Sequence, residues 1–398
     1  MSVLLALFAA VPKPALPQEP VAVPFVQPRH ADGSGPILFE VEAGGLRARA
    51  LLDTGAGRSI LSRSLAQRLE LPSGPALPVA GVGGGTSAAV AVLPELAIGG
   101  RIFENLAVSV LPLDSPGFER IRFDLILGSD LLRRCFLEID FDRSLLLFSP
   151  PEWGESAEGY RFQELGWAFG IPTVLAEAAG RPARFLLDTG NTAITVLNRP
   201  FFREGFESAA DHPSLEIAGV GGGLFLHLGR LENLRLAGLD FPGLAAGTPG
   251  REEPSGLMDM TLVDGVIGMA VLRDFRLAFD YERNRAGFAP GIRRRHRPVR
   301  AGPGLLVLPG HESARVGAVV RGSPAEEAGL GPGWLLLEID GETAAGRGAT
   351  WLQEALEGDA GSLVSLRLED PGGRRFRQAL RRVELHPPFR PKAAASQG

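Results

Sequence analysis

Short apolar runs that end at a glycine or at a turn residue recur along the chain. Two of them lead directly into an Asp-Thr-Gly segment, at 51–56 (LLDTGA) and at 186–191 (LLDTGN). Two more end at a glycine, at 124–128 (DLILG) and at 264–268 (DGVIG). Such runs, among the 52 glycines and 32 prolines of a 398-residue chain, predict short strands joined by tight turns. We therefore expect a mainly β protein.

These runs belong to an internal repeat of four elements that occur in the same order. The Asp-Thr-Gly segments lie 135 residues apart, and a glycine-rich segment follows the first Asp after 28 residues and the second after 31. The glycine-rich second element is 81–85 (GVGGG) in the first copy and 219–223 (GVGGG) in the second. The apolar runs that end at a glycine are the third element. The fourth is a predicted strand with acidic residues, 137–142 (LEIDFD) in the first copy and 277–282 (LAFDYE) in the second. The constant order predicts a duplicated fold of about 120 to 135 residues per copy.

Each repeated element has a physical rationale. A buried apolar strand that ends in Asp-Thr-Gly places a carboxylate at a turn, where the glycine allows another backbone to approach closely. The glycine-rich segments are too flexible for the interior of a strand and suit the tip of a hairpin that closes over a ligand. The support strands that end at Gly128 and Gly268 are expected to pack behind the Asp turns.

Composition narrows the possible chemistry. The formal net charge of −5 is too balanced for a protein that binds nucleic acid by neutralising its backbone. The single cysteine, Cys135, excludes an internal disulfide and a cysteine-based zinc site, and the six histidines are scattered along the chain. We therefore expect neither a nucleic-acid partner nor a metal centre.

The repeated motifs resemble those of aspartic proteases of the retropepsin and pepsin type, in the two-lobed single-chain form related to bacterial aspartyl proteases of retroviral-like fold. The resemblance covers about residues 33–290. It implies two lobes that form one pseudo-twofold cleft, with Asp53 and Asp188 as the catalytic pair and no cofactor. It also implies that Thr54 and Thr189 hydrogen-bond across the twofold axis. The implied flaps, which resemble the pair in retroviral dimers, are Gly81, Val82, Gly83, Gly84 and Gly85 in one lobe and Gly219, Val220, Gly221, Gly222 and Gly223 in the other.

The resemblance implies hydrolysis of peptide bonds without a covalent intermediate. Two carboxylates held about 3 Å apart share one proton, so one of them activates a water while the other donates to the substrate carbonyl. Gly55 and Gly190 belong to the turns that hold the pair, and the next position is Ala56 in one lobe and Asn191 in the other. We expect the Asn191 amide to lower the pKa of Asp188, which makes Asp188 the ionised partner. Alternatively, Asn191 only tolerates a left-handed turn.

The last third of the chain predicts a separate domain. A strand, a Ser323-Pro324 helix start, a short helix ended by Gly329 and a second strand follow one another. This order resembles a PDZ domain of the type found in exported bacterial proteases. The resemblance implies that loop 302–304 holds a peptide carboxyl terminus, in a groove between a strand and a helix at 350–356. The matching strand residues are Gly304, Leu305, Leu306 and Val307.

The amino terminus bears on localisation. Residues 3–11 form an apolar run of nine, far shorter than the roughly 20 residues of a membrane-spanning helix. The run has the apolar core and small residues of a secretory signal but no basic start, so a signal and a merely apolar tail both stay open. We expect export to the periplasm or beyond, because a proline-rich tether follows, with a cytoplasmic location as the alternative.

The expected domains follow from these assignments. They are a signal or proline-rich tether (1–28), a first protease lobe (29–150), a second protease lobe (151–290), a basic linker (291–300), a PDZ-like domain (301–386) and a disordered tail (387–398). The basic run is taken as a solvated linker rather than a nucleic-acid patch, because it is short and has no interleaved aromatic residues.

The expected partners are polypeptide substrates and a peptide terminus in the PDZ groove. Since one chain supplies both Asp residues, catalysis requires no dimer and we expect a monomer. Two other interpretations stay open. One is a catalytically silent scaffold that binds peptides, and the other is a structural β protein in which neither Asp affects any activity.

Overall fold

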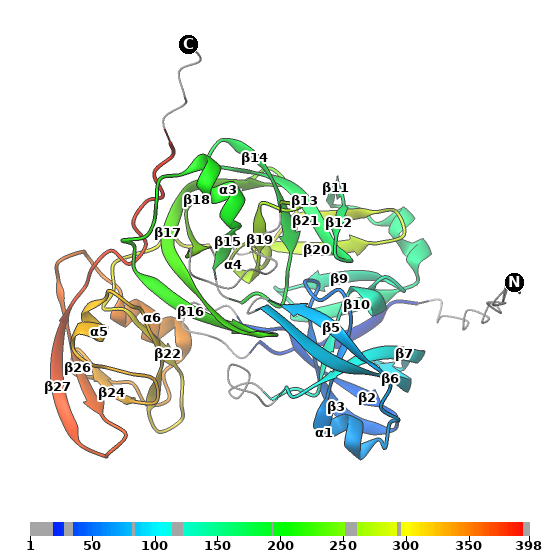
Figure 1. Cartoon of the computed structure of the whole chain (residues 1–398), viewed down its shortest axis with the longest axis horizontal. Helices are drawn as coiled ribbons and strands as arrows, with labels where there is room; N and C mark the ends of the chain where they lie inside the picture. Colours follow the sequence, from blue (N-terminus) through cyan, green and yellow to red (C-terminus); the bar gives the residue numbers. More distant parts are fainter. Residues whose placement is uncertain are drawn as a thin grey trace, which may run out of the picture.

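Each Asp-Thr-Gly segment follows an inner strand of its own β-sheet, and the two sheets have matching strand orders (Figure 1). These sheets form two lobes, a third sheet joins the lobes, and a fourth belongs to a C-terminal domain. The computed structural model describes residues 19–27, 35–81, 84–113, 122–192, 194–250, 261–292 and 296–392. The prediction of a mainly β protein is confirmed.

The sheet of the first lobe has the strand order β2-β3-β8-β4-β7-β6-β5. Its neighbours β3 and β8 run parallel and are fully buried where they end, which suits apolar runs without polar alternation. Helix α1 begins directly after β4, where the Ser62 hydroxyl accepts a hydrogen bond from the Leu65 N–H. The elements are β2 (Leu38–Ala43), β3 (Leu46–Leu52), β4 (Ile60–Ser62), α1 (Arg63–Arg68), β5 (Ala76–Gly81), β6 (Gly84–Ile98), β7 (Arg101–Leu111), β8 (Leu125–Leu127) and α2 (Ser129–Leu132).

The sheet of the second lobe repeats this order strand for strand, as β13-β14-β19-β15-β18-β17-β16, and adds β12 at one edge. Again the strand that precedes the Asp, β14, lies parallel to the short apolar strand β19. The elements are β12 (Gly166–Ala168), β13 (Ile171–Ala178), β14 (Arg181–Leu187), β15 (Thr195–Leu197), α3 (Arg199–Gly205), β16 (Ser214–Gly219), β17 (Gly222–Leu236), β18 (Leu239–Pro249), β19 (Gly265–Ile267) and α4 (Met269–Leu272).

A six-stranded sheet of order β1-β10-β9-β20-β21-β11 joins the lobes, because β9 from the first pairs antiparallel with β20 from the second. Its strands, with the 3₁₀ helix η1 between the lobes, are β1 (Val21–Pro24), β9 (Phe136–Asp140), β10 (Leu145–Ser149), η1 (Pro151–Ser156), β11 (Arg161–Glu164), β20 (Phe275–Asp280) and β21 (Arg285–Pro290).

The expectation of a signal or unpacked tether over 1–28 is wrong for its last part. Strand β1 pairs with β10, and the side chains of Val23 and Phe25 are buried. Apolar residues at alternate positions let this stretch pack at the edge of the joining sheet in spite of its prolines. Residues 1–18, on which the signal prediction rests, lie outside the described residues.

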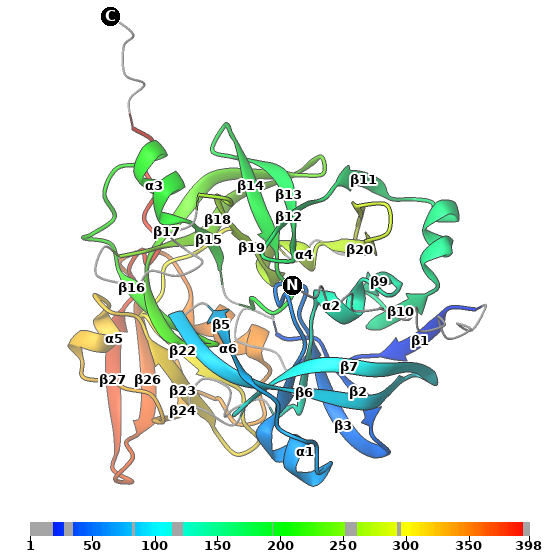
Figure 2. The same cartoon turned by 45° about the vertical axis from the view of Figure 1, so that its right-hand side comes forward.

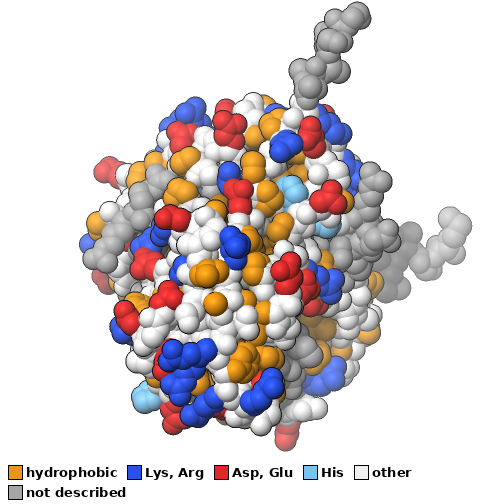
Figure 3. Space-filling view, turned by 90° about the vertical axis from the view of Figure 1, so that its left-hand side faces the viewer, with side chains coloured by type: hydrophobic (Ala, Val, Ile, Leu, Met, Phe, Trp, Pro, Cys, Tyr) orange, Lys and Arg blue, Asp and Glu red, His pale blue; other side chains and the backbone are white. Residues whose placement is uncertain are grey.

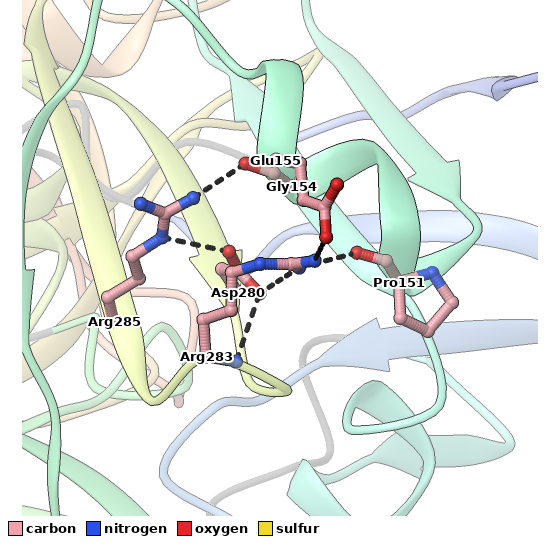
Figure 4. A network of polar contacts seen from close by, with 6 residues as sticks. All are labelled: Pro151, Gly154, Glu155, Asp280, Arg283 and Arg285. Carbon is pink, nitrogen blue, oxygen red and sulfur yellow. Dashed lines mark hydrogen bonds and ion pairs between the residues drawn. The ribbon is translucent and has the colours of Figure 1, made fainter.

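A cluster of arginines and carboxylates holds η1 against the hairpin of β20 and β21 (Figure 4). Asp280 is 1% exposed and accepts from Arg285 Nε at 2.9 Å and from Arg283 Nη1 at 3.4 Å. The same arginines reach η1: Arg285 donates to the Gly154 carbonyl at 2.6 Å, and Arg283 to Glu155 at 2.7 Å. Because Asp280 is buried and doubly paired, these charge-assisted bonds fix the connection between the lobes.

The C-terminal domain has a sheet of order β22-β23-β24-β26-β27, with β25 paired to β24, and its own apolar core. Helix α5 begins where the sequence predicts, because the Ser323 hydroxyl accepts from the Glu326 N–H and Pro324 occupies the first turn. The elements are β22 (Leu305–Leu308), β23 (Ala314–Val319), α5 (Pro324–Glu327), β24 (Leu335–Ile339), β25 (Glu342–Thr343), α6 (Ala349–Leu356), β26 (Leu363–Glu369) and β27 (Arg375–Arg381).

The prediction of a disordered tail over 387–398 is wrong for 387–392. Phe389 is 5% exposed and packs against Phe202 of the second lobe, with ring centroids 4.8 Å apart. Its N–H donates to the Arg230 carbonyl at 3.0 Å. An aromatic anchor therefore returns the chain from the C-terminal domain to the second lobe. The last six residues lie outside the described part.

Charges are mixed on the outer face of the C-terminal domain. Figure 3 shows Lys and Arg side chains interspersed with Asp and Glu over this face, with small apolar patches between them. The face therefore carries no continuous field of one sign.

Within the described ranges, no helix is both long and apolar enough to span a membrane.

Candidate active site

Asp53 and Asp188 occupy equivalent positions in the two lobes. Asp53 follows β3, and its N–H donates to the Leu127 carbonyl at 3.0 Å. Asp188 follows β14, and its N–H donates to the Ile267 carbonyl at 3.0 Å. Each Asp backbone is thus fixed by the short parallel strand beside it, and each side chain leaves the sheet at the same point of its lobe.

The two carboxyl groups face each other across the lobes. A Cβ built on Gly55 would lie 2.3 Å from Cγ of Asp188, and one built on Gly190 would lie 2.5 Å from Cγ of Asp53. Each carboxyl group therefore lies directly against the glycine of the opposite turn. Any residue larger than glycine at either position would push the opposite carboxylate away.

Four buried hydrogen bonds made by the two threonines lock the turns together. The Thr54 N–H donates to Thr189 Oγ1 at 3.0 Å, and the Thr189 N–H donates to Thr54 Oγ1 at 3.0 Å. The hydroxyls then donate onward, Thr54 Oγ1 to the Leu187 carbonyl at 2.7 Å and Thr189 Oγ1 to the Leu52 carbonyl at 2.9 Å. Both threonines are 0% exposed, so no water competes for these bonds. The reciprocal exchange holds the two Asp residues in a fixed relative position.

Burial and mutual repulsion perturb the pKa values of the pair. Burial raises the pKa of Asp53 well above its usual range, and the charge of Asp188 raises it further. Burial also raises the pKa of Asp188, but hydrogen bonds to its charged form oppose this shift. Asp188 Oδ1 accepts the N–H groups of Gly190 at 2.8 Å and Asn191 at 2.9 Å. Backbone hydrogen bonds from Gly55 and Ala56 likewise favour the charged form of Asp53, so both carboxyl groups are supported by their own turns and share one proton between them.

The position after each Asp-Thr-Gly acts through its backbone. The N–H of Asn191 favours the charged form of Asp188, whereas its side-chain amide donates to the Ile194 carbonyl at 3.2 Å. The hydrogen bond to Asp188 that was expected from the Asn191 amide is thus made by the Asn191 N–H, and the expectation that Asp188 is the ionised partner stays a prediction. The alternative of a left-handed turn is also wrong, since Asn191 is not among the described residues with positive φ.

The support strands end against the Asp turns. A Cβ on Gly128 would lie 2.7 Å from the Ala56 carbonyl oxygen, and one on Gly268 would lie 2.3 Å from the Asn191 carbonyl oxygen. The next residues tighten the contact, because the Ser129 N–H donates to the Ala56 carbonyl at 2.7 Å. The glycines thus allow each support strand to approach the turn that carries the carboxylate.

Two serines near the first Asp were missed in the sequence. Ser129 Oγ donates to the Thr54 carbonyl at 3.1 Å, and Ser59 Oγ accepts the Gly128 N–H at 3.1 Å. Ser59 Oγ also donates to Asp130 Oδ1 at 2.7 Å. Their only signal in the sequence is that they lie within a few residues of the repeated motifs. In the second lobe Met269 stands where Ser129 stands in the first.

The two glycine-rich hairpins converge at their tips (Figures 1 and 2). In the first, Gly81 pairs with Gly84, and in the second, Gly219 pairs with Gly222. A Cβ on Gly81 would lie only 2.1 Å from the Val220 carbonyl oxygen, so the tips are in direct contact.

Other predicted flap residues lie at or beyond these tips. A Cβ on Gly221 would lie 2.5 Å from the Gly84 carbonyl oxygen, while Gly85 and Gly223 continue strands β6 and β17. Val82 and Gly83 lie outside the described residues.

The second hairpin is bound to the C-terminal domain at its base. Ser214, at the start of β16, exchanges two backbone hydrogen bonds with Arg321, at 3.1 and 2.8 Å. Leu215 and Leu228 of this hairpin form a small buried cluster with Val320. The C-terminal domain therefore holds the strand that leads to one of the two tips.

One cavity of about 1540 Å³ contains the Asp pair and lies beneath the hairpins. Its walls near the pair are largely apolar and include Ile126 and Val266. The cavity continues past the linker into the C-terminal domain, where β22 and α6 line it. Across the described ranges, no group of three or more His, Cys, Asp or Glu side chains is placed to hold a metal ion.

Comparisons with known proteins identify two domains in this chain. The profile of one family, aspartyl protease, matches residues 39–131, and that of a second, PDZ domain, matches residues 315–370. The chain carries an aspartyl protease domain and a PDZ domain. The aspartyl protease match contains Asp53, the first hairpin and Gly128, while the second lobe shares its strand order.

Two further comparisons add little. A search of curated proteins gives no match. Among solved structures, the photosystem II D1 C-terminal processing protease aligns at 28% identity over 21% of this chain and 22% of that chain, with a TM-score of 0.20. A likeness of this extent carries no argument about fold or function.

The strand and helix predicted to form the PDZ groove lie together. β22 is the edge strand of the PDZ sheet, and α6 packs beside it. Along the strand Val307 is buried, Leu305 is half-buried and Leu306 is 39% exposed. Gly304 has a φ of +92°, and a Cβ there would lie 2.1 Å from Ser323 Oγ, so this position requires glycine.

Proposed function

We propose that this protein is an aspartic endopeptidase that hydrolyses peptide bonds in extended polypeptides. The observation that carries the proposal is the close approach of the Asp53 and Asp188 carboxyl groups at one cavity beneath two hairpin tips. Two carboxyl groups in such a position hold one proton between them and provide a base and an acid side by side.

In the proposed reaction, a water lies between the carboxyl groups and the substrate carbonyl lies above it. Ionised Asp188 removes a proton from the water while Asp53 donates its proton to the carbonyl oxygen, and the new C–O bond gives a tetrahedral diol. Asp188 then donates its proton to the amide nitrogen, and Asp53 recovers one from a diol hydroxyl as the C–N bond breaks. Both carboxyl groups return to their starting states.

The surroundings of the pair support an extended substrate. The hairpins offer backbone groups for strand addition, and apolar walls suit apolar side chains on either side of the scissile bond. Tips that meet above the pair would exclude bulk water during the reaction. The PDZ domain supplies a second peptide-binding surface.

The proposal is tested by cleavage of casein between pH 3 and 7, with the products identified by mass spectrometry. We expect endoproteolytic fragments, and we expect a pepstatin-type inhibitor, whose hydroxyl mimics the tetrahedral diol, to suppress them. Metal chelators and serine-directed reagents should have no effect. Cleavage that persists with the pepstatin-type inhibitor but stops with a serine-directed reagent would contradict the proposal.

A further inference from the structure

We propose that the PDZ groove binds the interior of an extended polypeptide rather than its carboxyl terminus, and that this polypeptide is the substrate lying in the protease cleft. The inference rests on the proposed function, because it names the substrate class of the same site. Its substrates are unfolded or extended chains long enough to occupy both places at once.

The first observation is that the groove and the cleft are one space. The cavity that contains Asp53 and Asp188 also reaches β22 and α6 of the PDZ domain. Linker residues 296–300 line the connection. A chain that lies along the groove can therefore continue to the Asp pair without leaving the cavity.

The second observation is a free strand edge in the groove. Among the described residues, β22 pairs only with β23, so its other edge is available for an added strand. The exposed side chain of Leu306 offers apolar contact there. Thr350 and Gln353 lie on one face of α6, and they line the same cavity together with Glu357, which directly follows the helix.

The third observation is that two of the three residues of loop 302–304 cannot donate a backbone N–H to a terminal carboxylate. An anion-binding nest needs successive backbone N–H groups. Pro303 has no N–H, and the N–H of Gly302 donates to the Val383 carbonyl at 3.0 Å. Within the loop, Gly304 is the one residue left to donate, and a single N–H is fewer than a nest needs for the expected role as a carboxylate holder.

The fourth observation is an acidic side chain at the same end of the groove. Glu357 follows α6 and lines the cavity, and Gln353 Nε2 donates to its Oε1 at 2.7 Å. The next residue, Gly358, donates to the Ala301 carbonyl at 3.0 Å, which places this end of α6 beside the loop. Of the nearby arginines, Arg300 already pairs with Asp359 at 3.8 Å. Arg297, which also lines the cavity, pairs with Glu354, so a terminal carboxylate there would compete with existing acidic partners for both arginines, whereas an internal peptide unit would not.

Binding is measured at pH 7 on the Asp53→Asn variant, which prevents cleavage of the probe. The probe is a fluorescein-labelled casein peptide of about 20 residues, roughly 65 Å when extended, made with a free carboxyl terminus or a terminal amide. We expect the two forms to bind within about twofold of each other. The Leu306→Asp change should weaken the binding of both forms by about tenfold or more, since it replaces with a charge the apolar surface that the bound peptide would cover.

Leu363→Asp is the matched control, because Leu363 is also an exposed leucine of the PDZ domain, at 60%, but does not line the cavity. We expect it to leave binding unchanged. Tighter binding of the free acid by about tenfold or more would overturn the proposal in favour of chain-end recognition. Equal binding by wild type and Leu306→Asp would also overturn it.

A cleavage experiment distinguishes failure of this proposal from failure of the proposed function. For wild type, we expect kcat/KM to rise by about tenfold or more when a cleaved casein peptide is lengthened on the side that reaches the groove. The ratio of kcat/KM for the longer peptide to kcat/KM for the shorter one should fall to about one in Leu306→Asp and stay high in Leu363→Asp. Cleavage without any gain from length would overturn the inference and leave the proposed function standing. Absence of any cleavage, with binding that still depends on Leu306, would overturn the proposed function instead.

Discussion

Replacing Thr54 by Val tests whether the threonine exchange holds the lobes together. Valine keeps the shape of the side chain but removes Oγ1, which donates to Leu187 at 2.7 Å and accepts from Thr189 at 3.0 Å. Both partners are backbone groups that would stay buried without a hydrogen bond. Each costs about 1–3 kcal/mol, so the change should lower the free energy of unfolding by about 2–6 kcal/mol. Serine at the same position keeps both bonds and serves as the control.

The assay is calorimetric melting together with kcat for a cleaved casein peptide. A loss of this size should lower the melting temperature of the protease lobes by at least about 5 °C. A small displacement of the Asp residues should also reduce kcat by about a hundredfold. A Thr54→Val protein that melts and turns over like Thr54→Ser would refute the reasoning.

Three more perturbations follow from the site and its surroundings. Burial and the charge of Asp188 raise the pKa of Asp53 in the folded protein. The stability that Asp53 contributes is therefore present below the pKa of the unfolded chain and is lost as the pH rises through the folded pKa. The Asp53→Asn variant should thus melt at a higher temperature than wild type at pH 7, by a margin that shrinks near pH 3. Phe389→Ala should cost about 3–5 kcal/mol of packing and release the C-terminal segment, seen as faster amide hydrogen exchange there. Gly81→Ala places a Cβ 2.1 Å from the Val220 oxygen and should lower kcat/KM by about tenfold, far more than Gly85→Ala, whose Cβ has nothing within 4 Å.

The close approach of Asp53 and Asp188 could be predicted from the sequence, because it depends on residues next to each Asp in the chain. Each Asp follows an apolar strand, and each neighbouring glycine leaves room for the opposite carboxyl group. Once the motif occurs twice in one chain, an arrangement of two equivalent turns follows from the repetition. The PDZ domain could also be predicted from the sequence, because the start of its helix at Ser323 is a local sequence signal.

The sequence analysis missed or mispredicted features that depend on contacts between distant parts of the chain. The anchoring of Phe389 needs an aromatic pocket formed by residues almost 200 positions earlier, such as Phe202. The pairing of Ser214 with Arg321 joins the second hairpin to the PDZ domain without any motif at either residue. The side chain of Asn191 suggested an amide donor to Asp188, whereas the backbone N–H makes this bond, because the sequence does not show which nitrogen faces the carboxyl group.

The central claim is that Asp53 and Asp188 act as one unit, and the most direct measurement is turnover of each single Asn variant. Asp53→Asn and Asp188→Asn are compared with wild type on the same casein peptide, with Asp240→Asn as a control, because Asp240 pairs with Arg235 on the surface. The account predicts that each variant of the pair loses at least about a thousandfold in kcat while the control keeps its activity. Wild-type turnover in either Asp53→Asn or Asp188→Asn would contradict it.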